Sequence, residues 1–289
     1  MSFSLAKTSD KPKRKFPKKS RRIIIIALIL AFFTSLVASN FCIKITKEVI
    51  YSEKIDEPLR IALISDLHSR SYGEKNEVLI NKIEKESPDL ILMAGDILTQ
   101  DSENKSDFEY LTNLVSSLSK ISPVYFVIGN QERFNSSLDV IRSCVILSGG
   151  VILDDEYTDI SLKGNRIRIG GLSYYRFWDE DANAFLSDFA DTDSNTFTLL
   201  LCHHPEFYQW GVKNFSIDLV VSGHTHGGML KLPLIGPVYA PEQGWFPEYG
   251  AGLYKEDNGY LAVTTGLASS PAYLPRFFNS PEIMIIDLK

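Results

Sequence analysis

Five short polar segments of this 289-residue chain follow apolar runs, and together they hold all five of its histidines. The segments are Asp66-Leu67-His68, Gly95-Asp96, Gly129-Asn130, His203-His204 and Gly223-His224-Thr225-His226. Histidines with ordinary surface or core roles would be scattered along the chain. A mixture of imidazole, carboxylate and amide groups suits zinc, manganese or iron better than calcium or magnesium.

These groups are numerous enough to bind two metal ions that share one carboxylate. Two ions about 3.5–4 Å apart are a recurrent device for phosphoester hydrolysis, because they activate water and neutralise phosphate charge. The sequence therefore has enough candidate ligands for a two-metal centre of this kind.

The apolar runs before these segments indicate an α/β domain. Residues 60–65, 89–94 and 124–128 are predicted strands, and the amphipathic stretches 74–87 and 104–121 between them are predicted helices. This alternation is typical of parallel βαβ units, whose functional groups gather at the carboxyl ends of the strands. Further strands are expected at 196–202, 218–221, 260–265 and 283–288, and a hairpin around Lys163-Gly164-Asn165.

The N-terminal part of the chain has a different composition. Residues 1–22 carry nine basic side chains and one acidic side chain, and residues 23–43 contain no charge. As a helix, the uncharged stretch would be roughly 31 Å long, about the thickness of a bilayer core. We expect a cytoplasmic tail (1–22), a transmembrane helix (23–43), a linker or first strand (44–59) and a catalytic domain (60–289) outside the cytoplasm, since basic residues stay on the cytoplasmic side.

The uncharged stretch 23–43 has one alternative interpretation, a cleaved signal peptide. Val37-Ala38-Ser39 could serve as a cleavage site, in which case the domain would be secreted. The composition of the chain also excludes two classes of protein. Residues 23–289 have 21 basic and 35 acidic side chains, a net charge of −14 with no basic stripe, so no nucleic acid partner is expected. Three scattered cysteines exclude a disulfide scaffold.

The ordered motifs D-x-H, G-D, G-N-x-D/E, H and G-H-x-H resemble those of the calcineurin-like metallophosphoesterases, from about residue 60 to the C-terminus. The segment HTHGGMLKLPLIGPVYAPEQG, together with the N-terminal helix, resembles the membrane-anchored bacterial branch of that family. The resemblance implies a sandwich of two β-sheets flanked by helices. It also implies hydrolysis of a phosphodiester or pyrophosphate, in some members within a lipid-linked substrate such as UDP-diacylglucosamine.

The resemblance further implies a role for each motif residue. Asp66, His68 and His226 would bind the first ion, and Asp96 would bridge both ions. Asn130, His203 and His224 would complete the second site. The ions would be divalent manganese, iron or zinc. Asp96, Asn130, Gln131 and His204 would act directly in catalysis, although His204 could instead be an ordinary loop residue before Pro205.

Gln131 departs from the family pattern, which usually has histidine at this position to help protonate the leaving group. Glutamine can donate a hydrogen bond but supplies no proton at neutral pH. Loss of a general acid typically costs on the order of 10²–10⁴ in rate. The sequence therefore leaves two alternatives: a slow hydrolase or one whose leaving group needs little protonation, and a non-catalytic metal- or phosphate-binding relative.

Two further features have open interpretations. The segment 232–256 is rich in proline, glycine and aromatic residues, and it is either a packed loop or an apolar surface beside the metals for a lipid-like substrate or a bilayer. Arg176 could hold a phosphate or stack on a neighbouring aromatic ring.

Gly95, Gly129 and Gly223 are expected to let the backbone turn sharply beside the ions. The oligomeric state is not predicted.

Overall fold

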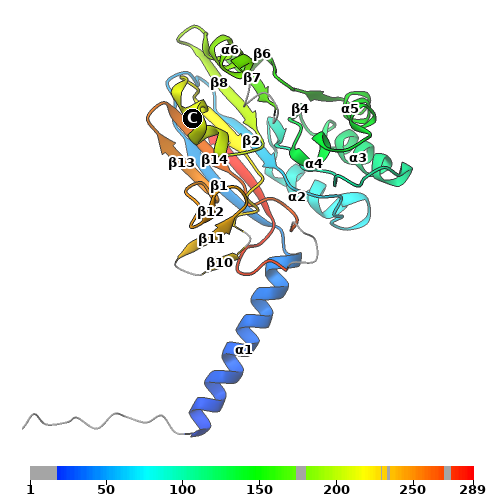
Figure 1. Ribbon diagram of the computed structural model, residues 1–289, viewed down its shortest axis with the longest axis vertical. Coiled ribbons are helices and arrows are strands. Elements are labelled where there is room, and N and C mark those ends of the chain that lie inside the picture. Colours follow the sequence, from blue (N-terminus) through cyan, green and yellow to red (C-terminus); the bar gives the residue numbers. More distant parts are fainter. Residues whose placement is uncertain (1–17, 174–179, 229, 233–234, 270–274) are drawn as a thin grey trace, which may run out of the picture. The chain divides into compact units, whose positions relative to one another are not determined.

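The computed structural model describes residues 18–173, 180–228, 230–232, 235–269 and 275–289 (Figure 1). The chain divides into two compact units, Met1–Ser35 and Leu36–Lys289. A single helix, α1 (Lys18–Phe41), runs from the first unit into the start of the second.

By length and composition, the stretch Arg22–Phe41 of α1 is able to span a membrane. The helix ends two residues before the predicted boundary at residue 43. Ile43 leaves the helix because its side chain is buried in the core of the domain, where it precedes the first strand.

The first of two six-stranded sheets contains the predicted βαβ units. Its order is β1-β15-β2-β3-β4-β5, and all neighbours are parallel except β15 and β2. The strands are β1 (Lys44–Ile50), β2 (Leu59–Ile64), β3 (Leu90–Met93), β4 (Val124–Phe126), β5 (Gly150–Ile152) and β15 (Glu282–Leu288). Helices α2 (Glu77–Glu86) and α3 (Lys105–Leu118) connect β2, β3 and β4 as the sequence predicts.

The second sheet has the order β13-β14-β9-β8-β7-β6. Its strands are β6 (Glu156–Leu162), β7 (Asn165–Leu172), β8 (Thr196–Cys202), β9 (Leu219–Ser222), β13 (Gly252–Glu256) and β14 (Gly259–Val263). The predicted hairpin at Lys163 and Gly164 joins β6 and β7 as an antiparallel pair. Strands β7, β8, β9 and β14 are parallel, so β8 and β9 end at the same edge.

Alternating side chains assign each sheet an inner and an outer face. On β2, Ile61 and Leu63 belong to the cluster between the sheets, whereas Ala62 and Ile64 belong to the cluster under the helices. The inner cluster also contains β7 and β8 side chains such as Ile169 and Leu199. The resulting α/β sandwich of two sheets confirms the predicted fold class.

Helices cover the outer faces of both sheets. Helices α2, α3 and α5 (Leu138–Leu147) pack on the first sheet (Figure 1), and α6 (Glu180–Ala190) and α7 (Glu206–Trp210) on the second. Three shorter helical segments are η1 (Glu74–Asn76), α4 (Asn130–Arg133) and η3 (Val212–Asn214).

A third, small sheet lies in the segment that sequence patterns left without assigned secondary structure. Strands β10 (Leu230–Leu232), β11 (Gly236–Ala240) and β12 (Gly244–Trp245) form an antiparallel meander. Several of its apolar side chains are exposed, among them Trp245 at 70% and the following Phe246 at 68%.

Candidate metal centre

The five polar segments predicted to bind metal meet where strands of both large sheets end. Asp66 follows β2, Asp96 follows β3 and Asn130 follows β4, all in the first sheet. In the second sheet, His203 follows β8 and His224 follows β9. Parallel strands bring their carboxyl ends to one edge, which is why segments far apart in the sequence become neighbours.

Asp66, His68 and His226 form the first group of potential ligands. Asp66 Oδ1 lies 4.0 Å from His68 Nε2 and 3.8 Å from His226 Nε2. The two imidazoles stack with their ring centres 5.1 Å apart. Among the described residues, the buried His68 Nε2 has no hydrogen-bond partner, which fits an atom directed at a metal ion.

Asp96 lies between this first group and a second group of potential ligands, which contains Asn130 and His203. Its Oδ2 is 3.9 Å from His68 Nε2 and 3.3 Å from His203 Nε2. His203 Nε2 is also 3.2 Å from Asn130 Oδ1. The side chain of Asp96 is therefore within reach of both groups, as a carboxylate shared by two ions would have to be.

His224 lies beside this second group but faces a residue that the motifs did not identify. Its ring centre is 5.2 Å from that of His203, and its Nε2 contacts the carboxylate of Glu242. His203, His204 and His224 form one group of potential ligands, and His204, Glu206, His224 and Glu242 form another. His204 is buried among these side chains, so its position is not that of an exposed loop residue.

The electrostatic surroundings keep two of the histidines neutral. Burial lowers the pKa of His68 to about 4 despite nearby Asp96. Burial, together with the positive charge of Arg276, lowers the pKa of His226 to about 3. Neutral imidazole is the form that binds metal ions, so both side chains fit the predicted role.

Asp96 and His203 interact electrostatically, with Oδ2 and Nε2 3.3 Å apart. Burial opposes charge on both, but His203 lowers the pKa of Asp96, and Asp96 raises the pKa of His203 to about 10. An ionised carboxylate at this buried position needs a positive partner, and a dication would supply one.

Backbone hydrogen bonds to Glu132 fix the loops that carry the ligands. Its carboxylate accepts from four backbone N–H groups: Asp96, Ile97, Leu98 and Gly129. This is the acidic residue at the last position of the G-N-x-D/E motif, and it joins the loop after β3 to the loop after β4. The bond to the Asp96 N–H helps to maintain the positive φ of that residue, a sparsely populated conformation. Four other candidate ligands also have positive φ: Asp66, His68, His224 and His226.

Gly95, Gly129 and Gly223 were predicted to allow sharp backbone turns beside the ions, but only Gly95 has the positive φ of such a turn. Gly95 has φ +84, so it makes the expected sharp turn. Gly129 and Gly223 are required for close approach instead. A Cβ on Gly129 would lie 2.2 Å from Asp96 Oδ1, and one on Gly223 would lie 2.5 Å from Asp66 Oδ2.

Gln131 contacts the loop after β3. Its backbone N–H donates to Asp96 Oδ1 at 2.8 Å, and its side-chain Oε1 accepts from the backbone N–H of Gln100 at 3.0 Å. Gln131 therefore contacts Asp96 through its backbone, whereas its side-chain amide contacts the backbone of Gln100. Arg176 lies outside the described residues.

Sequence reasoning did not single out Glu242, which follows the small sheet's strand β11. Its carboxylate is 3.2 Å from His204 Nδ1 and contacts His224 Nε2. Burial opposes its charge, but the bonds to these two histidines lower the pKa of Glu242. The sequence feature that could have identified Glu242 is its place as an acidic residue in the segment 232–256, which follows His224 and His226.

Replacing Glu242 by glutamine should weaken metal binding at the predicted second site, which includes His203 and His224. Removing the carboxylate leaves His204 and His224 without the negative charge that orients them, and loss of such a partner typically costs about 10–100-fold in metal affinity. The measurement is the manganese concentration that gives half-maximal phosphodiester hydrolysis. Glu109→Gln, on the exposed face of α3, is the matched control. The same manganese dependence in both variants would contradict this role.

Comparison with known proteins agrees with the geometry. A sequence model described as calcineurin-like phosphoesterase matches residues 59–228. The chain is 28% identical over 236 residues to the uncharacterized metallophosphoesterase YkuE of Bacillus subtilis, covering 80% of this chain and 79% of that protein. It is 25% identical to an uncharacterized metallophosphoesterase of Aquifex aeolicus, with 92% and 98% covered. It is also 25% identical to the phosphodiesterase YaeI of Escherichia coli, with 80% and 82% covered.

The matched region begins at β2 and ends two residues after His226, so it contains every motif that carries a candidate ligand. It also covers more than half of the chain. The chain belongs to the calcineurin-like phosphoesterase family.

Proposed function

We propose that this phosphoesterase hydrolyses a phosphodiester or pyrophosphate bond at a centre of two divalent ions, while anchored in a membrane by α1. The observation that supports hydrolysis at a two-ion centre is the position of Asp96, whose buried carboxylate lies between His68 and His203. Asp66, His68 and His226 would hold one ion and Asn130, His203 and His224 the other, with Asp96 shared.

The protein side chains prepare this site for phosphate chemistry. Bound manganese, iron or zinc would lower the pKa of water and supply positive charge toward the phosphate. His204 and Gln131 are the proposed contacts to the phosphate, beside His224 and Asp96 respectively. The amide of Gln131 donates hydrogen bonds but holds no proton to transfer, so the leaving group should need little protonation.

Hydrolysis of bis-(p-nitrophenyl) phosphate by the full-length, detergent-solubilised protein tests this function. We expect release of nitrophenol that depends on added Mn²⁺ and is abolished by a chelator. A rate equal to the protein-free blank at every Mn²⁺ concentration would favour the non-catalytic alternative.

Gln131→His should raise turnover on substrates with poor leaving groups. Histidine at this position would add a general acid, which contributes on the order of 10²–10⁴ in rate. The measurement is kcat for a methyl phosphodiester, whose leaving alkoxide is strongly basic, compared with the nitrophenyl diester. An equal change for both substrates, or no change, would remove this explanation for Gln131.

The membrane anchor is supported by the last turn of α1. The backbone N–H of Asn279 donates to Ser39 Oγ, and Asn40 exchanges two hydrogen bonds with the backbone of Arg276. Cleavage after Ser39 would remove one of these partners and separate the helix from the domain, so these contacts favour a retained anchor over a signal peptide. The basic residues before the helix favour a cytoplasmic N-terminus and an external domain.

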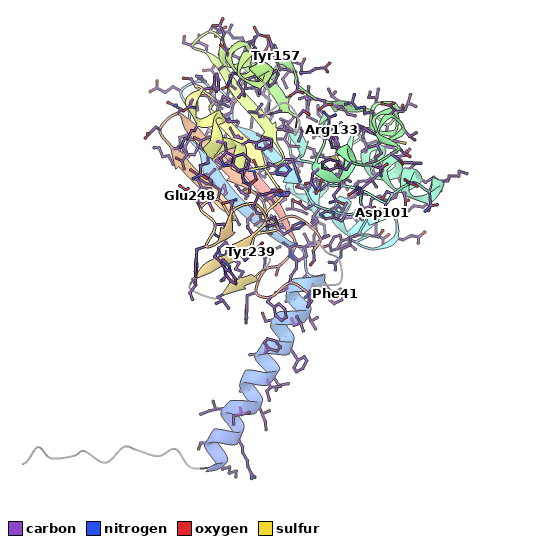
Figure 2. All side chains as sticks on the ribbon, in the orientation of Figure 1. Phe41, Asp101, Arg133, Tyr157, Tyr239 and Glu248 are labelled. Atoms are coloured by element: carbon purple, nitrogen blue, oxygen red, sulfur yellow. The ribbon has the colours of Figure 1, made fainter. Side chains whose placement is uncertain are left out.

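The small sheet supports contact with a bilayer. Figure 2 shows its Tyr239 at the same end of the domain as Phe41, the last residue of α1. The exposed rings of Tyr239 and Trp245 contact each other with centres 5.5 Å apart. Aromatic side chains of this kind are enriched at membrane–water interfaces. A lipid-linked phosphoester is therefore the proposed substrate class.

A further inference from the structure

A cavity of about 620 Å³ lies within the unit Leu36–Lys289, at the C-terminal end of α1. One part of its wall is formed by Leu36, Val37 and Phe41 from the helix and by Pro275. Another part is formed by His68 and Arg70, which follow β2. The cavity thus extends from the end of an apolar helix to a candidate metal ligand.

The helical part of the wall is apolar and accessible. Val37 is 56% exposed and Phe41 is 69% exposed, whereas apolar side chains on the following strands are mostly buried. Figure 2 shows Phe41 at the end of α1 beside the domain. Exposed apolar side chains are expected on a membrane-spanning helix, and here they also line a concave site, which suits an apolar ligand.

The other part of the wall is suited to an anion. The guanidinium of Arg70 lies 5.7 Å from the ring centre of Phe41 and 5.0 Å from that of Tyr72, and it donates to the carbonyl of Asn40. These contacts hold a positive charge at the boundary between the apolar wall and His68. A phosphate near His68 and an alkyl chain along the helix would each meet a complementary surface.

We propose that this cavity binds the alkyl chain of the phosphoester substrate, with the phosphate directed toward His68 and Arg70 beside it. The proposal rests on the proposed phosphoesterase function and names the part of the substrate that the cavity recognises. Each buried methylene group should strengthen binding about fourfold. The protein should therefore prefer phosphoesters with long alkyl chains.

Hydrolysis of two diesters, 4-nitrophenyl ethyl phosphate and 4-nitrophenyl octyl phosphate, tests this preference. The full-length protein should be kept with Mn²⁺ in a sterol-based detergent, because the chain of an alkyl detergent would compete for the cavity. We expect kcat/KM to be at least about tenfold higher for the octyl diester. A ratio near one in the wild-type protein would overturn the proposal.

Val37→Trp should reduce the octyl-to-ethyl ratio at least about fivefold, because the indole fills the apolar part of the cavity. Val140→Trp, on α5 and 45% exposed, is the matched control and should leave the ratio unchanged. Partition of the octyl chain into detergent affects all variants alike, so it does not change this comparison. Equal ratios for the Val37 variant and the wild type would contradict the proposed cavity.

A binding measurement separates this proposal from the proposed function. Isothermal titration with octylphosphonate and ethylphosphonate requires no turnover, and octylphosphonate should bind at least about tenfold more tightly. A protein that hydrolyses neither diester but shows this difference would contradict only the hydrolase function. A protein that hydrolyses both diesters alike and binds both phosphonates alike would contradict only the cavity.

Discussion

Asp96→Asn is expected to lower Mn²⁺-dependent hydrolysis of bis-(p-nitrophenyl) phosphate by roughly 10³-fold, equivalent to about 4 kcal/mol of activation free energy. Asp96 Oδ2 is within 4 Å of ligand atoms on both His68 and His203. Asparagine keeps the shape but removes the charge that both metal sites would share. The remaining neutral side chain would bind each ion more weakly.

Asp101→Asn is the control for this substitution. Asp101 is an exposed aspartate on the same loop after β3 (Figure 2), and its replacement should leave the rate within about twofold of the wild type. Thermal unfolding of both variants with and without Mn²⁺ would show whether Asp96→Asn loses metal rather than fold. Wild-type activity in Asp96→Asn would exclude the shared-carboxylate centre.

Arg276→Met is expected to lower the free energy of unfolding by about 4 kcal/mol. Arg276 is 3% exposed, and its guanidinium donates to the backbone carbonyls of Thr265, Gly266, Ala268 and His226. Methionine fills similar volume but leaves these buried acceptors without their donor. For a domain of this size the melting temperature should fall by about 10 °C.

The effect should also reach the metal centre, because the carbonyl of Ala268 accepts from His226 Nδ1 at 3.0 Å. Arg276→Met should therefore reduce the thermal stabilisation that Mn²⁺ gives the wild type. Arg166→Met is the control, since Arg166 pairs with Asp193 on the surface and such pairs contribute only about 0–1 kcal/mol. Equal melting temperatures for the two variants would show that the buried guanidinium is not a structural support.

The sequence predicted the strands of the parallel core well, because their apolar runs are short, bounded and followed by polar residues. Strands β2, β3, β8 and β9 all lie within two residues of their predicted bounds. The motif order also placed Asp66, Asp96 and His203 correctly at strand ends. These features are local, so periodicity and neighbouring residues are enough to identify them.

Features that depend on tertiary contacts were not predictable in the same way. Strand β1 pairs with β15 at the other end of the chain, and nothing in residues 44–50 indicates that partner. Glu242 reaches His204 and His224 only because the small sheet folds back after β11. The side chain of Arg276 is buried against four backbone carbonyls, and no neighbouring residue in the sequence indicates that burial.

The hydrogen bonds of Ser39 and Asn40 have a consequence for how the enzyme would meet its substrate. Because they join the last helical turn to the loop of Arg276, the ligand cluster cannot swing away from that turn as it would on a flexible tether. With α1 inserted in a bilayer, as proposed, the enzyme would meet substrate that shares the same lipid layer. Turnover would then follow the mole fraction of substrate within the lipid layer, so diluting that substrate with inert lipid should slow the reaction even at constant total concentration.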